Sequence, residues 1–396
     1  MAKAELVEIV ATDAAFDALA TEWRALHDAC GRSVFQSFEW NRAWWRAFGG
    51  GRGHTLHIVT VRDGGALIAI APFFEEKSRV VGVLPLRTLR WIGASMSDYQ
   101  DVLVAPERAH AAFAALAGRV AAAGAEVLSL NDMPEEGDAT RALSSALRDA
   151  GFAGDLEPGA PCPRLLLQPT WDDTLAAMKP SHAKRIAYID RKLKRNFRVA
   201  VEVATPETLT ADFDLFVEMH QSRWTADGQP GVMSSPQMIG FHREVVGAFA
   251  QRGWLSLSFL SLDGKRVVAN YAFKRNGVLE FYLSGAADDD AARKFAPGIL
   301  LHVYNIQALI AEGGSVYDFL RGDERYKYEL GAVDRRNRSV VLLNRLKPYA
   351  SALHVARKAQ QAAWRLGARA KRELGGRLGA GSAAAFVLDN PAILAL

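Results

Sequence analysis

Apolar and small polar residues alternate in three short stretches of the second half of the chain, at residues 254–262, 266–273 and 278–284. Such alternation is typical of strands that are buried on one face only. Asp263-Gly264 separates the first two stretches and Asn276-Gly277 separates the last two, and both dipeptides favour tight hairpin turns. The pattern therefore predicts an antiparallel meander of three strands.

A helix and a further strand follow this meander. Pro297-Gly298 begins the helix, because proline is favoured at the first helical position, where its missing N–H is not needed. Apolar residues then recur at helical spacing from Ile299 to Ile310, and Gly313-Gly314 ends the helix. Residues 315–320 form the closing strand. The predicted order is three strands, a loop, a helix and a strand.

The first half of the chain repeats this order more faintly. Residues 55–61 and 66–74 read as strands around the turn Asp63-Gly64-Gly65. A helix follows from Pro106 to Gly124, and residues 126–130 read as the closing strand. Two halves with the same order of elements indicate an internal duplication of one α/β module.

Length and composition agree with two globular domains. A chain of 396 residues is longer than a single hydrophobic core usually supports. The hydrophobic fraction of 49% with 23% charged residues is typical of soluble proteins. No apolar run is long enough for a membrane span, and the N-terminus lacks a secretory signal, so we expect a cytoplasmic protein. Only Cys30 and Cys162 are present, so neither a disulfide framework nor a metal site is expected.

Positive charge is unevenly distributed. The formal net charge is +4, yet residues 179–198 contain eight Lys or Arg and one acid. The predicted helix at 182–195 carries most of them, and residues 345–377 are basic as well. This distribution favours an anionic partner such as phosphate groups, nucleic acid or a membrane surface.

The loop before the helix of the second copy is suited to phosphate. A helix N-terminus offers unpaired N–H groups and the positive end of a dipole. Arg293 and Lys294 precede it, and the amides of Gly298, Ile299 and Leu300 are expected to face a pyrophosphate. At the matching place the first copy carries acids instead, namely Asp98, Asp101 and Glu107. Because acids repel phosphate, we predict that the second copy binds the donor and the first is degenerate.

Four stretches carry a resemblance to a known family: FQSFEW at residues 35–40, MHQSRW at 219–224, APG at 296–298 and YDFLRGDE at 317–324. They resemble the CelD/BcsL-type acetyltransferases of the GNAT fold, which are related to FemAB-like peptidyltransferases. The resemblance implies an α/β (α+β) fold of tandem GNAT-like acyl-CoA N-acyltransferase modules, each with a mixed, mainly antiparallel sheet flanked by helices. The expected parts are an N-terminal module at 1–165, a catalytic module at 166–346 and a basic helical tail at 347–396.

The resemblance also implies an activity. It is the transfer of an acetyl or other acyl group from acyl-CoA to an amine or hydroxyl of a small molecule or glycan (EC 2.3.1), in polysaccharide or cell-envelope biosynthesis. The enzyme would act in the cytoplasm or at the inner face of the membrane. One departure is the phosphate loop, because residues 293–298 keep a single glycine and include a proline.

Candidate catalytic residues lie at or near the closing strand. One of the acids Asp318, Asp323 and Glu324 would take the proton of the acceptor. Tyr326 or Tyr328 would protonate the leaving thiolate. The alternatives are that Asp318 caps the strand end and that Glu324 pairs with a neighbouring arginine. His220 is a further candidate, but it lies on an apolar helical stripe, where a core histidine is the more common interpretation. Candidates for holding the acceptor are Arg223, Trp224, Arg321, Lys327 and Arg185.

Two other functions remain open. One is a FemAB-like aminoacyltransferase that draws on aminoacyl-tRNA, with the basic face of the 182–195 helix as its tRNA contact. The other is a non-catalytic scaffold that binds a glycan or a nucleotide-sugar.

Overall fold

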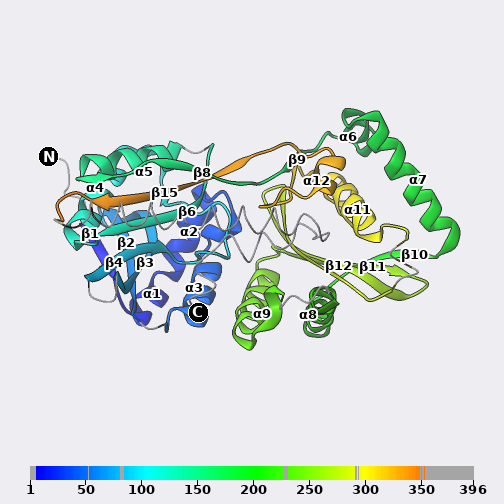
Figure 1. The fold of residues 1–396 in the computed structure, drawn as a ribbon, viewed down its shortest axis with the longest axis horizontal. Helices are drawn as coiled ribbons and strands as arrows, with labels where there is room; N and C mark the ends of the chain where they lie inside the picture. Colours follow the sequence, from blue (N-terminus) through cyan, green and yellow to red (C-terminus); the bar gives the residue numbers. More distant parts are fainter. Residues whose placement is uncertain are drawn as a thin grey trace. The chain divides into compact units, whose positions relative to one another are not determined.

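The structure is a computed structural model that describes residues 6–51, 53–80, 84–136, 138–226, 231–289, 292, 294–347, 349 and 352. The chain divides into two compact units (Figure 1). The first contains Met1–Ala160 together with Asn337–Leu396, and the second contains Pro161–Arg336. The expected basic tail at 347–396 lies almost wholly outside the described residues.

The first unit is a mixed sheet with helices packed against it. Its strands are β1 (Leu6–Val10), β2 (His54–Asp63), β3 (Ala66–Val80), β4 (Leu84–Trp91), β5 (Leu103–Val104), β6 (Val127–Pro134), β7 (Phe152–Ala153), β8 (Leu156–Pro161) and β15 (Arg336–Asn344). Its helices are α1 (Asp13–Ala18), α2 (Ala20–Cys30), α3 (Phe38–Phe48), α4 (Ala109–Ala123) and α5 (Asp138–Asp149). The sheet order is β1-β2-β3-β4-β6-β15-β7, and β4 and β6 are parallel.

The placement of β15 differs from the expected division of the chain. A second module reaching residue 346 was expected, but β15 pairs with β6 and β7 of the first sheet. Its apolar side chains Val340 and Leu342 are buried in the core of the first unit. The second unit therefore ends at Arg336.

The second unit contains the predicted meander. Its strands are β9 (Arg164–Leu166), β10 (Val199–Val203), β11 (Leu255–Leu262), β12 (Lys265–Arg275), β13 (Val278–Ala286) and β14 (Val316–Asp318). Its helices are α6 (Trp171–Ala177), α7 (Pro180–Asn196), α8 (Leu209–Ala226), α9 (Pro236–Gln251), α11 (Pro297–Ala311) and α12 (Arg325–Glu329). The sheet order is β10-β11-β12-β13-β14-β9, and only the β13–β14 pair is parallel.

Local turn chemistry explains the meander. Asp263 and Gly264 have φ values of 52° and 85°, and Asn276 and Gly277 have 50° and 74°. Two successive residues with positive φ make the turn that matches the twist of a hairpin, and Asp-Gly and Asn-Gly adopt it readily. The predicted turns are therefore confirmed.

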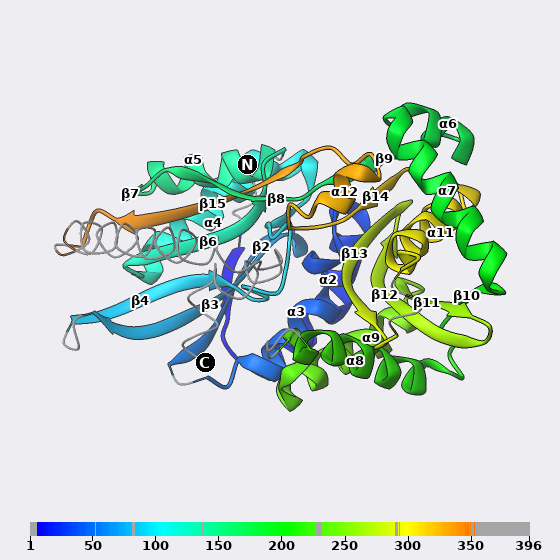
Figure 2. The same ribbon diagram turned by 45° about the vertical axis from the view of Figure 1, so that its right-hand side comes forward.

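Helices cover both faces of the second sheet. Helices α8 and α9 lie on one face, and α7 and α11 lie on the other (Figures 1 and 2). Each unit is thus a mixed, mainly antiparallel sheet flanked by helices, which confirms the expected tandem α/β architecture. None of the helices in the described part of the chain is long and apolar enough to cross a membrane.

Candidate functional site

The parallel strands β13 and β14 of the second unit are paired over only part of the length of β13. Strands β13 and β14 pair only from Val278 to Glu280 and from Val316 to Asp318. Strand β14 then ends, whereas β13 continues to Ala286. On this side, residues 281–286 have no strand partner within the described residues. The continuation of β13 leads directly into the loop before α11, so this is where a ligand would meet both the strand and the helix.

The N-terminus of α11 presents one open amide. Ile299 and Leu300, which were expected to face a phosphate, instead donate their N–H groups to the carbonyl of Ala296, at 3.1 and 3.4 Å. The N–H of Gly298 has no hydrogen bond to any described residue. A β-carbon placed on Gly298 would meet no atom within 4 Å, so a ligand has room to approach. Lys294 is exposed nearby in the sequence, and Arg293 lies outside the described residues.

A cavity of about 430 Å³ lies at the start of α11. It is lined by Arg185 of α7, Ile299 of α11, and Arg325, Tyr326 and Glu329 of α12. The fold thus brings together three residues that the sequence pointed to separately, Arg185, Ile299 and Tyr326. The Glu329 carboxylate pairs with both guanidinium groups, that of Arg185 and, at 2.8 Å, that of Arg325. With two arginines and one glutamate, the lining of the cavity carries a net positive charge.

Tyr326 is held in the wall of this cavity by His302 of α11. The two rings are stacked, with centroids 5.3 Å apart and planes 20° apart. The His302 Nδ1 also lies 2.8 Å from the Tyr317 hydroxyl. Burial, with a smaller effect of the Lys327 charge, lowers the pKa of His302 to about 3, so its ring is neutral at neutral pH. The sequence pattern does not single out His302, because this residue lies among the apolar residues of α11.

Asp318 is engaged in a local turn. Its side chain is buried, and its Oδ1 accepts a hydrogen bond from the Leu320 N–H at 2.8 Å. Leu320 has a φ of 53°, which is unfavourable for a leucine, and this hydrogen bond helps to hold the chain there. These contacts match the alternative in which Asp318 caps the strand end.

Lys327 shapes the same loop and is not open to an acceptor. Its side chain is 2% exposed. Its ammonium donates to the carbonyl oxygens of Arg321, Gly322 and Leu320, at 2.9, 3.2 and 3.3 Å. It also pairs with Glu324 at 2.9 Å. The substrate-binding role expected for Lys327 is therefore replaced by that of a buried brace, and Glu324 is its counter-ion.

His220 lies beside the part of β13 that extends beyond its pairing with β14. Its Nδ1 is 2.7 Å from the carbonyl oxygen of Ser284. Because a carbonyl only accepts hydrogen bonds, Nδ1 carries a proton, and in the neutral form of the ring the lone pair is therefore on Nε2. Trp224 is half-buried, with its ring 6.0 Å from that of His220. The side chain of Arg223 lies outside the described residues.

Close packing of α8 on β13 fixes the position of His220. A β-carbon on Gly285 would lie 2.9 Å from Met219 Cβ and 3.0 Å from the His220 backbone nitrogen. Glycine is therefore required for this approach. A second histidine, His242 of α9, is fully buried, with its Nδ1 3.4 Å from the Tyr271 hydroxyl. Burial, with a smaller contribution from His220, lowers its pKa to about 3.

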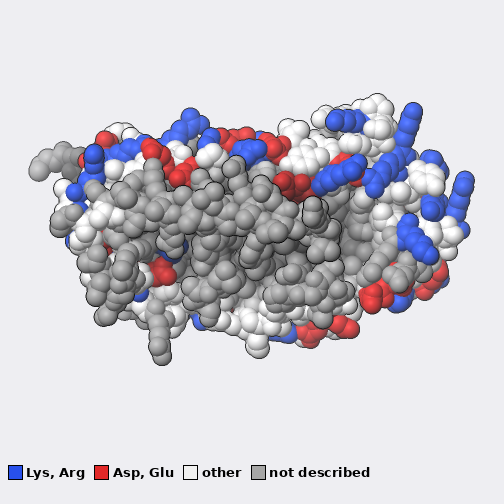
Figure 3. Space-filling view, viewed as in Figure 1, with Lys and Arg blue, Asp and Glu red and all other residues white. Residues whose placement is uncertain are grey.

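The outer face of α7 is basic and contains an exposed aromatic ring. Lys184, Tyr188, Arg191 and Arg195 follow one another at helical spacing, opposite the buried Ile186 and Leu193. Tyr188 is 57% exposed. Within the described residues, the three cations have no ion-pair partner, and Figure 3 shows basic side chains projecting where α7 lies.

Two of the three acids that the first copy carries at the place matching the phosphate loop are internal. Asp98 is buried and accepts a hydrogen bond from Asn337 Nδ2 at 3.0 Å. Burial raises the pKa of Asp101 to about 7, so this group is only partly charged at neutral pH. The predicted charge contrast between the two copies is therefore weaker than the sequence suggested, because only Glu107 is exposed.

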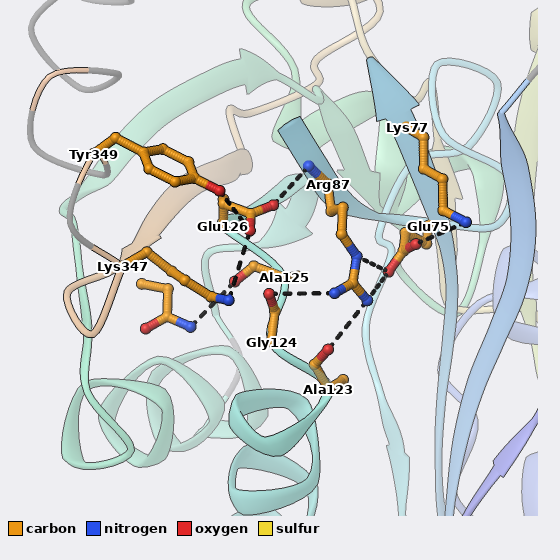
Figure 4. Close-up of polar contacts among 10 residues, drawn as sticks. Glu75, Lys77, Arg87, Ala123, Gly124, Ala125, Glu126, Lys347 and Tyr349 are labelled. Atoms are coloured by element: carbon orange, nitrogen blue, oxygen red, sulfur yellow. Dashed lines mark hydrogen bonds and ion pairs between the residues drawn. The ribbon is translucent and has the colours of Figure 1, made fainter. Parts of the chain in front are cut away.

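Other charged residues of the first unit serve its structure (Figure 4). The Arg87 guanidinium donates to Glu75 at 2.9 Å and to the carbonyl oxygen of Ala123, at the end of α4, at 3.1 Å. Glu126 accepts hydrogen bonds from the Arg87 backbone N–H at 2.8 Å and the Tyr349 hydroxyl at 3.1 Å. These contacts join α4, β4 and the segment after β15.

Solved structures with similar folds span nearly the whole chain. FemX matches with a TM-score of 0.60 and 12% identity, covering 88% of this chain and 99% of FemX. A conserved protein of unknown function from Bacteroides thetaiotaomicron matches with a TM-score of 0.51 and 12% identity, covering 85% and 100%. L-PGS from Bacillus licheniformis matches with a TM-score of 0.50 and 9% identity, covering 85% and 95%. At these identities the similarity concerns the fold alone.

The sequence itself matches one family model. No curated protein matches the chain. Residues 181–328, from the start of α7 to α12, match the acetyltransferase (GNAT) domain. This range contains the separating strands, the α11 N-terminus and the cavity described above. The second unit of the chain is therefore similar to the acetyltransferase (GNAT) domain over these residues.

Proposed function

We propose that the protein is an acyltransferase (EC 2.3.1) that moves an acetyl or other acyl group from acyl-CoA to an amine or hydroxyl of a small molecule or glycan. The observation that carries this proposal is the separation of β13 from β14 after Glu280, on the strand that leads through a loop to α11. An extended acyl-pantetheine chain fits such an opening, because β14 does not cover this part of β13.

Phosphate groups of the donor are assigned to the start of α11. The open amide of Gly298 and the positive end of the helix favour an anion there. Arg185 and Arg325 of the adjoining cavity supply positive charge. Both guanidinium groups pair with Glu329, so phosphate binding requires the Glu329 carboxylate to move away or to share these two arginines with the phosphate. Arg293 and Lys294 remain predicted phosphate ligands from the loop.

In the reaction, His220 Nε2 takes the proton from the acceptor nitrogen or oxygen, which attacks the thioester carbonyl carbon. The carbon–sulfur bond then breaks as the tetrahedral intermediate collapses. Tyr326 donates its phenolic proton to the departing thiolate. His220 is preferred to Asp318 and Glu324 as the base, because the latter two are engaged in the loop after β14.

We extend the proposal to acceptors of polysaccharide or cell-envelope biosynthesis, on the resemblance of residues 219–224 and 317–324 to CelD/BcsL-type acetyltransferases. The same resemblance places the reaction in the cytoplasm or at the inner face of the membrane. Arg321 and Trp224 stay candidates for contacting the acceptor.

A second candidate function is aminoacyl transfer from aminoacyl-tRNA, which is favoured by the outer face of α7. Lys184, Arg191 and Arg195 suit the phosphates of RNA, and the exposed Tyr188 ring suits stacking on an unpaired base.

One crossed experiment distinguishes these donors. The wild type is compared with Arg185→Glu and Arg191→Glu, two variants that change residues of the same helix, α7. Each protein is titrated with acetyl-CoA, CoA, tRNA, UDP-sugars and short glycans. Acyl-CoA use predicts that acetyl-CoA raises the melting temperature and that only Arg185→Glu weakens its binding, about tenfold or more. Use of tRNA predicts salt-dependent tRNA binding that only Arg191→Glu weakens.

The same titrations can contradict the leading proposal. Absence of binding by every acyl-CoA tested would reject it. Binding of a UDP-sugar or glycan without either donor would favour a non-catalytic scaffold.

A further inference from the structure

Strand β10 forms one edge of the second sheet. Residues 199–203 pair antiparallel with residues 258–262 of β11, with Val201 opposite Leu260. No other described strand pairs with β10. One side of this strand therefore carries backbone groups without a sheet partner.

Flanking hydrogen bonds show which groups these are. The Ala204 N–H donates to the Leu257 carbonyl, and the Asp263 N–H donates to the Arg198 carbonyl, both at 2.9 Å. In an antiparallel pair the bonded residues alternate, so the even-numbered residues of β10 point their N–H and C=O groups toward β11. Those of Val199, Val201 and Val203 point outward, and within the described residues nothing bonds to them.

The side chains on this strand do not protect the edge. Natural edge strands are usually blocked by lysine, proline or a bulge. Strand β10 reads VAVEV and has none of these. Val201 is 41% exposed and Val203 is 57% exposed. Its one charged side chain, Glu202, pairs with Arg266 at 2.7 Å, and Arg266 also pairs with Asp212. Within the described part of the chain, no other strand therefore covers the exposed valines and the outward-facing hydrogen-bonding groups of this edge.

We propose that β10 pairs with β10 of a second copy of this chain, antiparallel and centred on Val201. A two-fold axis at Val201 places Val201 opposite its own copy and Val199 opposite Val203 of the partner. The outward-facing residues then meet one another, which gives about six interchain hydrogen bonds. The pairing joins the two sheets of the second units and makes no use of the proposed catalytic function.

The sequence of the strand is self-complementary in this register. On one face valine meets valine, and on the other face Ala200 meets Glu202, so no like charges lie opposite each other. The two Arg198 side chains begin about 20 Å apart along the paired strands, which is well beyond the screening length in physiological salt. A second copy fits this edge better than an unrelated peptide does, because both partners then bury the same exposed valines.

The paired edge is small compared with an obligate interface, so we expect a weak, concentration-dependent dimer. Sedimentation of the wild type should show the average mass rising above the monomer value of 43.2 kDa as the concentration increases from about 10 to about 500 µM. Val201→Lys should stay monomeric, whereas Val333→Lys, at a valine of the same unit that is 55% exposed, should dimerise as the wild type does.

The register is tested by cysteine substitutions in a Cys30→Ala background, which keeps only the buried Cys162 of the native cysteines. Paired residues with Cα atoms about 5.5 Å apart can form a disulfide, so Val201→Cys should cross-link to its own copy. Val203→Cys should not, because the two copies of residue 203 would be about 14 Å apart. Any of three results would overturn the proposal. The wild type could be monomeric at every concentration, Val333→Lys could be as monomeric as Val201→Lys, or the two cysteine variants could cross-link equally.

Discussion

The Nδ1 of His220 lies 2.7 Å from the carbonyl oxygen of Ser284, in the part of β13 that β14 does not cover. This hydrogen bond defines the tautomer of a buried histidine and directs its basic nitrogen away from the strand. It links the helix that carries the proposed base to the strand along which the donor is proposed to lie.

Replacing His220 by asparagine tests its role as the base. Asparagine keeps an N–H that can donate to the Ser284 carbonyl, but it removes the basic nitrogen. We expect kcat/KM to fall about 100-fold or more, with the affinity for acetyl-CoA unchanged. Steady-state kinetics and a binding titration measure the two effects. An enzyme that keeps its activity would remove His220 from the reaction.

Two glycines near the site should respond in opposite ways to alanine. Gly285→Ala pushes a methyl group into Met219 and the His220 backbone, so we expect a loss of about 1–3 kcal/mol in unfolding free energy. Gly298→Ala meets no atom within 4 Å and should leave stability nearly unchanged. It should instead raise the KM for acyl-CoA, because the new methyl group stands where phosphate is proposed to approach. Equal effects on stability and KM in the two variants would contradict this distinction.

Lys327→Met distinguishes a brace from a substrate ligand. The change leaves three carbonyl groups and Glu324 without the ammonium that they share. We expect a loss of about 3 kcal/mol in unfolding free energy, measured by urea denaturation. Lys294→Met, at an exposed position, is the matched control and should cost little. A stable Lys327→Met enzyme with only a raised acceptor KM would restore the substrate-binding role.

The buried His242 should make the second unit sensitive to acid. Its folded pKa of about 3 is below its value of 6.5 when unfolded. The unfolded chain therefore binds the extra proton first, and stability declines as the pH falls from about 6.5 to about 3, by about 1.4 kcal/mol per pH unit. His242→Phe should show a shallower decline in urea denaturation between pH 6.5 and 4.5. Equal slopes for both proteins would argue against a buried neutral ring.

Asp101 should have the opposite effect in the first unit. Its folded pKa of about 7 lies above the ordinary value of 3.8, because burial disfavours the carboxylate. The folded state thus holds the proton more tightly, and this contribution to stability is lost as the pH rises from about 4 to about 7. Asp101→Asn keeps an oxygen for the Val102 N–H and carries no charge. The stability of this variant relative to the wild type should rise across the same interval in pH-dependent denaturation.

Local sequence determined the elements of the second unit. Asp263-Gly264 and Asn276-Gly277 specify their turns because these residues tolerate positive φ, whatever surrounds them. Pro297 marks the start of α11 for a similarly local reason. Arg185 and Ile299 were also identified as candidates from sequence, because basic residues and helix N-termini favour phosphate wherever they occur.

Only the tertiary structure decided how distant residues combine. The pairing of β15 with β6, and of β9 with β14, joins segments far apart in the chain, and alternating apolar residues do not specify their partners. Lys327 was expected to hold the acceptor, yet the loop after β14 encloses it. His242 and His302 lie within apolar helical faces, where the sequence shows their burial but not the hydroxyl groups that they meet. Burial and partnership depend on long-range packing, and for that reason the candidate site became visible only in the folded chain.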